Sequence, residues 1–166
     1  MEKKDTQNIL TRDEIKGIVE DLKLRSEIIE KYPYPVEELA KSLGYTSYYF
    51  SPSKDTENIS GAVNHDKKKI YINENDPIRR QLFTCAHEIG HIILHKNQGN
   101  IVDFRSSFVN PVDNIENEAD MFAAELLMPE DLFKEKLKEY GSLQIVASFF
   151  GVSLQAAMLR NKIISK

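Results

Sequence analysis

Residues 83–95 read FTCAHEIGHIILH, a run that contains one complete H-E-x-x-H array. The residues around the array are strongly apolar, among them Ile89, Ile92 and Leu94, and such a run is typical of a buried helix. Two histidines and a glutamate are costly to bury in such a helix unless they share a partner. The run therefore predicts a metal-binding helix around which the rest of the fold is arranged.

The spacing within the array indicates how the metal is held. His87 and His91 are four residues apart, a little over one helical turn and about 6 Å of rise, so both rings project from one face. Glu88 then lies beside the ion without binding it, in the position of a general base for water that the metal activates. The array supplies two ligands, and a third must come from elsewhere in the chain.

His95 continues the same face four residues further on. In an intact helix it lies about 12 Å along the axis from His87, too far for three rings to share an ion whose ligands lie about 2 Å from it. We therefore expect His95 to pack behind a ligand histidine or to hydrogen-bond to one. The fourth histidine, His65, falls in a polar turn and is expected to be solvated.

A second helix is the best source of the third ligand. Residues 114–129 read NIENEADMFAAELLMP, and their apolar members recur at helical spacing. Glu116 and Asp120 border the buried face, where carboxylates need a cation or a hydrogen-bond donor. We predict that Glu116 binds the metal and that Asp120 accepts a hydrogen bond from a ligand histidine. Glu118 is the alternative ligand, but it lies about 200° around the helix from Glu116, so the two cannot both face the metal.

The first half of the chain predicts a mixture of helices and a small sheet. Residues 11–31 and 36–43 have the pattern of a helical hairpin, with Thr11 as the first N-cap. Three segments that follow have the composition of strands, and the last two form a hairpin: residues 45–51, 59–63 and 69–73.

The metal-binding helix has a start signal of its own. Asp76 is predicted to be its N-cap and Pro77 its first residue, so that the helix runs from about Pro77 to His95. Arg79 and Arg80 are expected on its solvated face. Residues 99–113 show no strong period and are predicted to be a long loop beside the site.

The C-terminal part, residues 130–166, reads as three short helices. Within it, residues 143–160 have the pattern of a helix-turn-helix, with Gly151 at the turn and Ser153 as the cap of the second helix. The charged side chains from Ser142 onward are all basic: Arg160, Lys162 and Lys166. They give a weak basis for direct nucleic-acid binding, and a packing role for these helices is the alternative.

Composition restricts the class of protein. The 166 residues carry a formal net charge of -4, so they create no chain-wide basic field for nonspecific nucleic-acid binding. We expect no contact with a membrane, because no run approaches the roughly 18 apolar residues that a span needs. The single cysteine, Cys85, excludes an internal disulfide and is expected to be a small buried hydrophobe. These features, with a charged first segment, predict a cytoplasmic location.

The residues of the two helices carry a resemblance to a known family. The array from His87 to His91, followed by Glu116 and the run to Pro129, resembles the ImmA/IrrE family of zinc metallopeptidases. The resemblance covers roughly residues 36–129, including the predicted hairpin. It implies a gluzincin-like fold, with His87, His91 and Glu116 as metal ligands and Glu88 as the catalytic glutamate. It also implies a partner, a transcriptional repressor of the helix-turn-helix type.

Together these observations predict an α+β fold in which a small, partly antiparallel sheet packs on a zincin-like catalytic helix. We expect residues 1–129 to form the metallopeptidase domain and residues 130–166 a helical extension packed on it. The predicted reaction is peptide-bond hydrolysis with one zinc ion, with another divalent metal as an alternative. The sequence identifies no oxyanion-stabilising side chain, and Arg105 in the long loop is a guess. The rival function is a metal-stabilised regulatory protein that inactivates a repressor without cleaving it.

Overall fold

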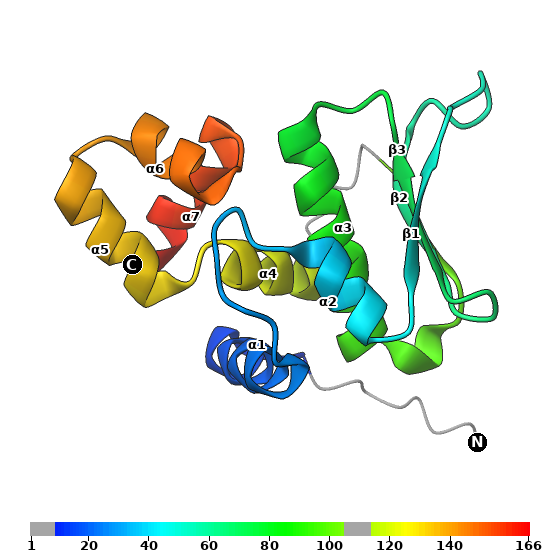
Figure 1. Ribbon diagram of the computed structural model, residues 1–166, viewed down its shortest axis with the longest axis horizontal. Helices are drawn as coiled ribbons and strands as arrows, with labels where there is room; N and C mark the ends of the chain where they lie inside the picture. Colours follow the sequence, from blue (N-terminus) through cyan, green and yellow to red (C-terminus); the bar gives the residue numbers. More distant parts are fainter. Residues whose placement is uncertain (1–8, 105–113) are drawn as a thin grey trace.

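The computed structural model describes residues 9–104 and 114–166. Within these residues the chain forms seven α-helices, a short 3-10 helix and four strands (Figure 1). In chain order they are α1 (Arg12–Ser26), α2 (Val36–Ser42), β1 (Thr46–Phe50), β2 (Ile59–Asn64), β3 (Lys69–Asn73), α3 (Ile78–Leu94), η1 (Lys96–Gln98), β4 (Ile101–Phe104), α4 (Asn114–Leu127), α5 (Glu130–Tyr140), α6 (Leu143–Phe150) and α7 (Leu154–Ile164).

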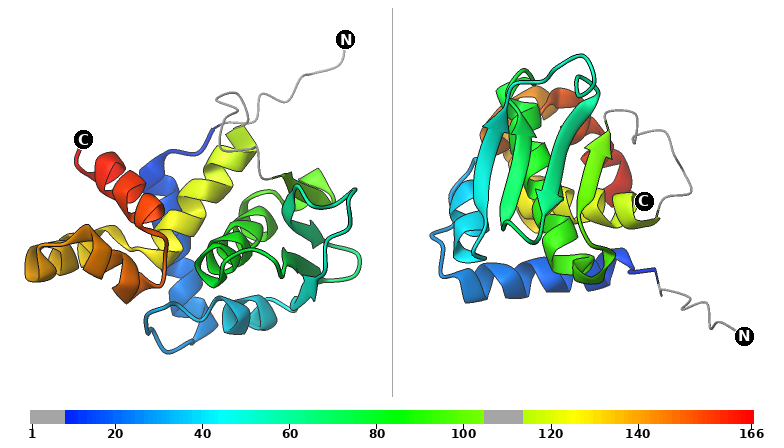
Figure 2. Two further views of the ribbon diagram at one scale, coloured as in Figure 1. Left: turned by 90° about the horizontal axis from the view of Figure 1, so that it is seen from above. Right: turned by 90° about the vertical axis from the view of Figure 1, so that its right-hand side faces the viewer.

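The sheet is mixed, with the strand order β1-β3-β2-β4. β1 runs parallel to β3, whereas β2 is antiparallel to both β3 and β4. The helices lie on one face of the sheet (Figure 2), and the side chains of Val63, Ile70 and Ile72 are buried. The predicted hairpin and the α+β class are therefore confirmed.

The central helix α3 packs between the sheet and α4 (Figure 1). A Cβ atom on Gly90 would lie 3.2 Å from the Cα of Ala119 and 3.2 Å from a ring carbon of Phe122, so the glycine permits this close crossing of α3 and α4. Cys85 lies on the buried part of α3, where burial raises the pKa of its thiol to about 12. As expected, Cys85 behaves as a small buried hydrophobe.

Two helix ends differ from the predictions. Helix α1 starts after its Thr11 cap as predicted, but it ends at Ser26, because Glu27 adopts a left-handed conformation with φ 55°. The apolar spacing continues beyond this point, yet Ile29 is 84% exposed. For α3, the N-cap is Pro77 rather than Asp76, since the ψ angle of Pro77 is 145° and helical geometry begins one residue later.

The segment predicted as a loop after α3 contains a strand. Residues Ile101–Phe104 form β4, which pairs antiparallel with β2 at the edge of the sheet. Four residues are too few to show a clear alternation, so the pattern did not reveal the strand. Residues 105–113 of the predicted loop, including Arg105, lie outside the described residues.

The C-terminal helices have the predicted helix-turn-helix geometry. Ser153 caps α7 by accepting a hydrogen bond from the backbone N–H of Ala156, and α6 and α7 meet at 108° with Gly151 between them. The ring of Tyr32 stacks on Phe149, so α6 packs against the N-terminal half of the chain. The division at residue 129/130 stays a prediction.

Two arginines differ from their predicted environments. Arg160 is only 3% exposed, since its Nε donates to the carbonyl of Met128 and its Nη2 pairs with Glu125. It is therefore unavailable for phosphate contact, which weakens the case for nucleic-acid binding by this tail. Arg79 does not lie on a purely solvated face, because it donates to the carbonyl of Val152 at 3.1 Å.

Among the helices of residues 9–104 and 114–166, no single one has the length and apolar character to cross a membrane. The bent pair α6 and α7 meets both criteria only when taken together.

Candidate metal centre

Three side chains converge where α3 crosses α4. The Nε2 atoms of His87 and His91 lie 3.0 Å apart. The carboxylate of Glu116 reaches both rings, at 3.0 Å from His87 Nε2 and 3.2 Å from His91 Nε2. His87 and His91 are buried and Glu116 is largely so, and the three donor groups form a set that could hold one metal ion.

The donor set fits a divalent metal in both spacing and chemistry. Ligands about 2.0–2.1 Å from a tetrahedral zinc are roughly 3.3 Å from one another, close to the separations seen here. Two imidazole nitrogens and one carboxylate oxygen form the ligand set of many catalytic zinc sites, in which the fourth position stays open. The residues present therefore suit such an ion.

Hydrogen bonding orients His87 toward this set. Its Nδ1 lies 2.8 Å from Oδ1 of Asp120, and an ionised carboxylate can only accept, so Nδ1 carries the proton. In a neutral ring the lone pair is then on Nε2, which faces Glu116 and His91. A lone pair directed at a carboxylate is unfavourable unless a cation lies between them, which is a further reason to infer a metal here.

Electrostatics favour the protonation states that a metal requires. Burial lowers the pKa of His91, although Glu116 opposes the shift, so the ring is neutral near pH 7. Burial also works against the charge on Glu116, but its interactions with His87 and His91 outweigh it and hold the pKa of this carboxyl well below its usual range. Neutral imidazoles and an ionised carboxylate are the forms that bind metal.

Glu88 lies on the sheet side of α3 and is fully buried. A Cβ atom on Gly61 of β2 would lie 2.8 Å from the Oε1 of Glu88 and 2.5 Å from the Cγ2 of Thr84. The absence of a side chain at Gly61 therefore makes room for the Glu88 carboxylate. Gly61 was not singled out for this role in the sequence, because nothing in a strand pattern indicates which helix residue lies opposite.

The remaining polar residues form two groups, one in contact with His87 and the other in line behind His91. Asp120 contacts His87, as predicted, with its side chain 36% exposed. His95 lies behind His91, with the two Nδ1 atoms 2.9 Å apart. Glu118, the alternative ligand in the sequence, instead lies 2.8 Å from His95 Nε2. The structure thus brings together the predicted residues, and their assignment as ligands and base stays a prediction.

Comparison with known proteins adds independent information. A family model described as the IrrE N-terminal-like domain, Peptidase_M78, matches residues 40–162. Metallopeptidase ImmA of Bacillus subtilis is 34% identical over 104 residues, which cover 59% of this chain and 60% of ImmA. The uncharacterized immunity region protein 2 of Bacillus phage phi105 is 32% identical over 105 residues, covering 62% and 66%.

Two further matches are more partial. The radiation response metalloprotease IrrE of Deinococcus radiodurans is 35% identical over 83 residues, which cover 49% of this chain and 25% of IrrE. The chain thus spans less than two thirds of the length of each of these three relatives. A solved structure of a Mycobacterium tuberculosis transcriptional regulator matches 87% of this chain and 45% of that one, with a TM-score of 0.61. At 15% identity this match shows a common fold alone.

Proposed function

This chain belongs to the M78 peptidase family with the IrrE N-terminal-like domain, and from that premise we propose that it is a zinc metallopeptidase. The observation that carries the proposal is the convergence of His87, His91 and Glu116, with Glu88 next in the chain to a ligand. Two relatives named metallopeptidase and metalloprotease support the same reaction class.

His87, His91 and Glu116 would hold the ion. Zinc, when bound, supplies a Lewis acid that polarises a carbonyl and makes water more acidic. Glu88 accepts a proton from the attacking water and delivers one to the leaving amine. The hydrogen bond from His87 to Asp120 keeps the ligand nitrogen of that ring unprotonated. Zinc is preferred for two imidazoles and one carboxylate, and another divalent metal is the alternative.

We further propose that the substrate is a regulatory protein, specifically a transcriptional repressor of the helix-turn-helix type. The resemblance to the ImmA/IrrE family supports this choice, and one relative from a phage is named for an immunity region. The proposed location is the cytoplasm, since a single buried cysteine fits a reducing compartment.

The alternative function is repressor inactivation by binding, with a metal held for structure. A structural metal site has no need of Glu88 and is usually closed by a fourth protein ligand. The set found among the described residues has three members. This favours the peptidase.

The two functions are separated by Glu88→Gln, which keeps size and hydrogen-bonding capacity but removes the base. Purified zinc-loaded protein would be incubated with candidate repressors, and the fragments identified by mass spectrometry. We expect Glu88→Gln to retain metal and fold but to cleave at least about a hundredfold more slowly, since general acid-base catalysis contributes 10²–10⁴-fold.

A matched control is Glu57→Gln, which neutralises an exposed carboxylate and is expected to cleave at the wild-type rate. Unchanged processing of the repressor by Glu88→Gln would exclude the peptidase function. Repressor inactivation without any fragment, by both wild type and variant, would support the binding function instead.

A further inference from the structure

A line of buried hydrogen bonds leads from His91 away from the metal site. The Nδ1 of His91 lies 2.9 Å from the Nδ1 of His95, and the Nε2 of His95 lies 2.8 Å from Oε2 of Glu118. The other oxygen of Glu118 accepts a hydrogen bond of 2.7 Å from the backbone N–H of Leu10. His91, His95 and Glu118 are at most 7% exposed, so water does not compete for these contacts.

The direction of each hydrogen bond follows from the carboxylate at the end of the line. Glu118 already accepts from Leu10, and as an ionised carboxylate it also accepts from His95, so the proton of His95 is on Nε2. In a neutral His95 ring the Nδ1 is then an acceptor, and the Nδ1 of His91 must donate to it. This leaves the Nε2 of His91 unprotonated, with its lone pair toward His87 and Glu116.

We propose that His95 and Glu118 are positioning residues that fix His91 in its metal-binding tautomer. The proposal deepens the proposed function, because it assigns these two residues a role at the same metal site. They act through His91 and touch neither the metal nor the substrate. The reverse arrangement would put a proton on His91 Nε2, in the position needed by the ion.

The two ligand histidines are thus oriented in different ways. His87 hydrogen-bonds directly to Asp120, whose side chain is 36% exposed. His91 is too deeply buried to reach an acid at the surface, and an intervening histidine carries the effect of the charge of Glu118 to it. The hydrogen bond from Leu10 makes the segment just before α1 part of this arrangement, which anchors Glu118 in one orientation.

The first test measures tautomers directly in the full-length protein. Long-range ¹H–¹⁵N spectra of the metal-free protein, at a pH where the histidines are neutral, distinguish a ring protonated on Nδ1 from one protonated on Nε2. We expect Nδ1–H for His91 and Nε2–H for His95 in the wild type. In His95→Phe, which removes the acceptor, His91 should change to Nε2–H or to a mixture. A wild-type His91 protonated on Nε2 would overturn the proposal, even if no variant folds.

The second test measures zinc affinity by competition with a chromophoric chelator. Removing a hydrogen-bond partner of a ligand histidine typically lowers metal affinity 10–100-fold, and we expect such a loss in His95→Phe. His95→Asn places an amide oxygen near the position of Nδ1, so it should accept from His91 and keep most of the affinity. Equal losses of zinc affinity in the Phe and Asn variants would contradict the proposed positioning of His91 by His95.

The matched control is His65→Phe, which removes the histidine that contacts Tyr45 at the sheet and should leave zinc affinity unchanged. Failure of this proposal is distinguishable from failure of the proposed function. If the wild type binds zinc and the His91 tautomer is as expected but no repressor is cleaved, only the peptidase function fails. If cleavage occurs and His91 is protonated on Nε2, only the proposed role of His95 and Glu118 fails.

Discussion

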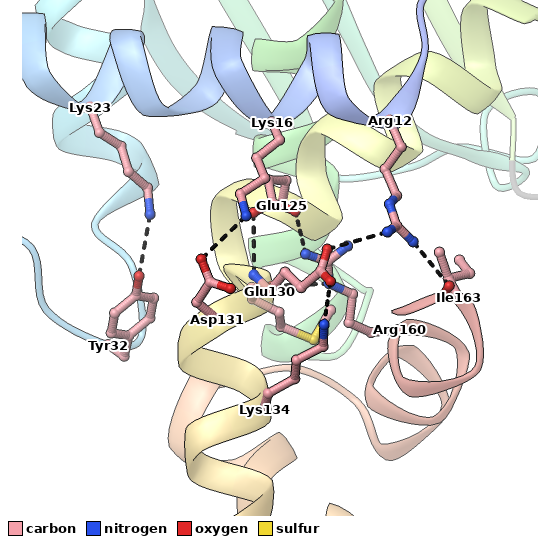
Figure 3. Close-up of polar contacts among 11 residues, drawn as sticks. Arg12, Lys16, Lys23, Tyr32, Glu125, Glu130, Asp131, Lys134, Arg160 and Ile163 are labelled. Atoms are coloured by element: carbon pink, nitrogen blue, oxygen red, sulfur yellow. Dashed lines mark hydrogen bonds and ion pairs between the residues drawn. The ribbon is translucent and has the colours of Figure 1, made fainter. Parts of the chain in front are cut away.

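Helix α4 carries buried carboxylates at both of its ends, and the two ends use them differently. Near the N-terminal end, Glu116 faces His87 of α3, and Glu118 faces His95, which caps the C-terminal end of α3. Near the C-terminal end, Glu125 pairs with Arg160 of α7 (Figure 3). One helix therefore contributes acids to two polar clusters with different kinds of partner.

The C-terminal cluster, which we call the arginine clamp, consists of Arg12, Glu125, Glu130 and Arg160 (Figure 3). Its carboxylates meet guanidinium groups, and its remaining donors meet carbonyls, such as that of Ile163, which accepts from Arg12 at 3.0 Å. The clamp joins α1, α4, α5 and α7. Its positive charges come from the chain itself, so it stabilises the fold without an added ion.

The candidate metal centre, which consists of His87, His91 and Glu116 and which we call the metal cluster, instead gathers groups that accept hydrogen bonds or can bind a metal ion. Imidazole nitrogens of His87 and His91 and the Glu116 carboxylate converge on one point, and the proposed metal ion would complete their interactions. The comparison teaches that burial of charge alone does not identify a functional site. The two clusters differ in the source of positive charge: the chain supplies it to the arginine clamp, but not to the metal cluster.

The largest effect on stability is expected from Arg160→Leu. This change leaves Glu125 buried without its guanidinium partner, and breaking a buried pair costs about 3–5 kcal/mol in the free energy of unfolding. Urea denaturation would measure the loss. The control is Lys162→Leu, an exposed cation on the same helix, which should change stability by less than about 0.5 kcal/mol. Equal losses of stability in the Arg160→Leu and Lys162→Leu variants would mean that the clamp does not stabilise the fold.

At the other end of α4, Glu116→Gln should affect metal binding rather than folding. Loss of a direct ligand should lower zinc affinity by more than about a hundredfold, beyond the 10–100-fold range typical of residues behind the ligands. Unfolding of the metal-free protein should be little changed. Metal content after purification would measure the difference, with Glu118→Ala for comparison. Loss of metal in the Glu118 variant alone would reverse the ligand assignment.

The sequence predicted the metal cluster well because the spacing of residues in a helix determines which side chains lie on the same face. Residues four apart share a face, so the convergence of His87 with His91 followed from position, and the apolar face of residues 114–129 favoured Glu116 over Glu118 as the third ligand. The pairing of His95 with Glu118 did not follow, since it depends on how closely α3 crosses α4. That distance is set by Gly90 and the small residue Ala119.

The arginine clamp was not predicted for a related reason. Arg160 and Glu125 are 35 residues apart and lie on separate helices, so no local period connects them. The sequence indicates Arg160 as one of three basic side chains with a weak basis for phosphate contact, but Arg160 is buried, whereas Lys162 is exposed. The end of α1 was also misplaced, because apolar residues continue at helical spacing beyond a left-handed Glu27. Long-range packing and single backbone angles leave little trace in sequence.

The smallest expected effect concerns Glu130, at the margin of the clamp, and depends on pH. Hydrogen bonding to Lys134 lowers the pKa of Glu130, as does the charge of Arg12, although burial opposes the shift. Its folded pKa is therefore below the value of about 4.5 of the unfolded chain, and its stabilisation is present above that pH and is lost as pH falls through the folded pKa.

Glu130→Gln should therefore destabilise the protein by about 0.5–1 kcal/mol at pH 7, and the difference should shrink steadily below about pH 4.5. Urea denaturation at a series of pH values would measure this. Glu135→Gln, on the same helix but with a carboxylate 66% exposed, should show a smaller difference at pH 7. A Glu130 effect that stays constant to low pH would mean that packing, rather than charge, joins Glu130 to the clamp. The contrast between a cluster neutralised by the chain and one proposed to bind a metal would then depend on the Arg160–Glu125 pair alone.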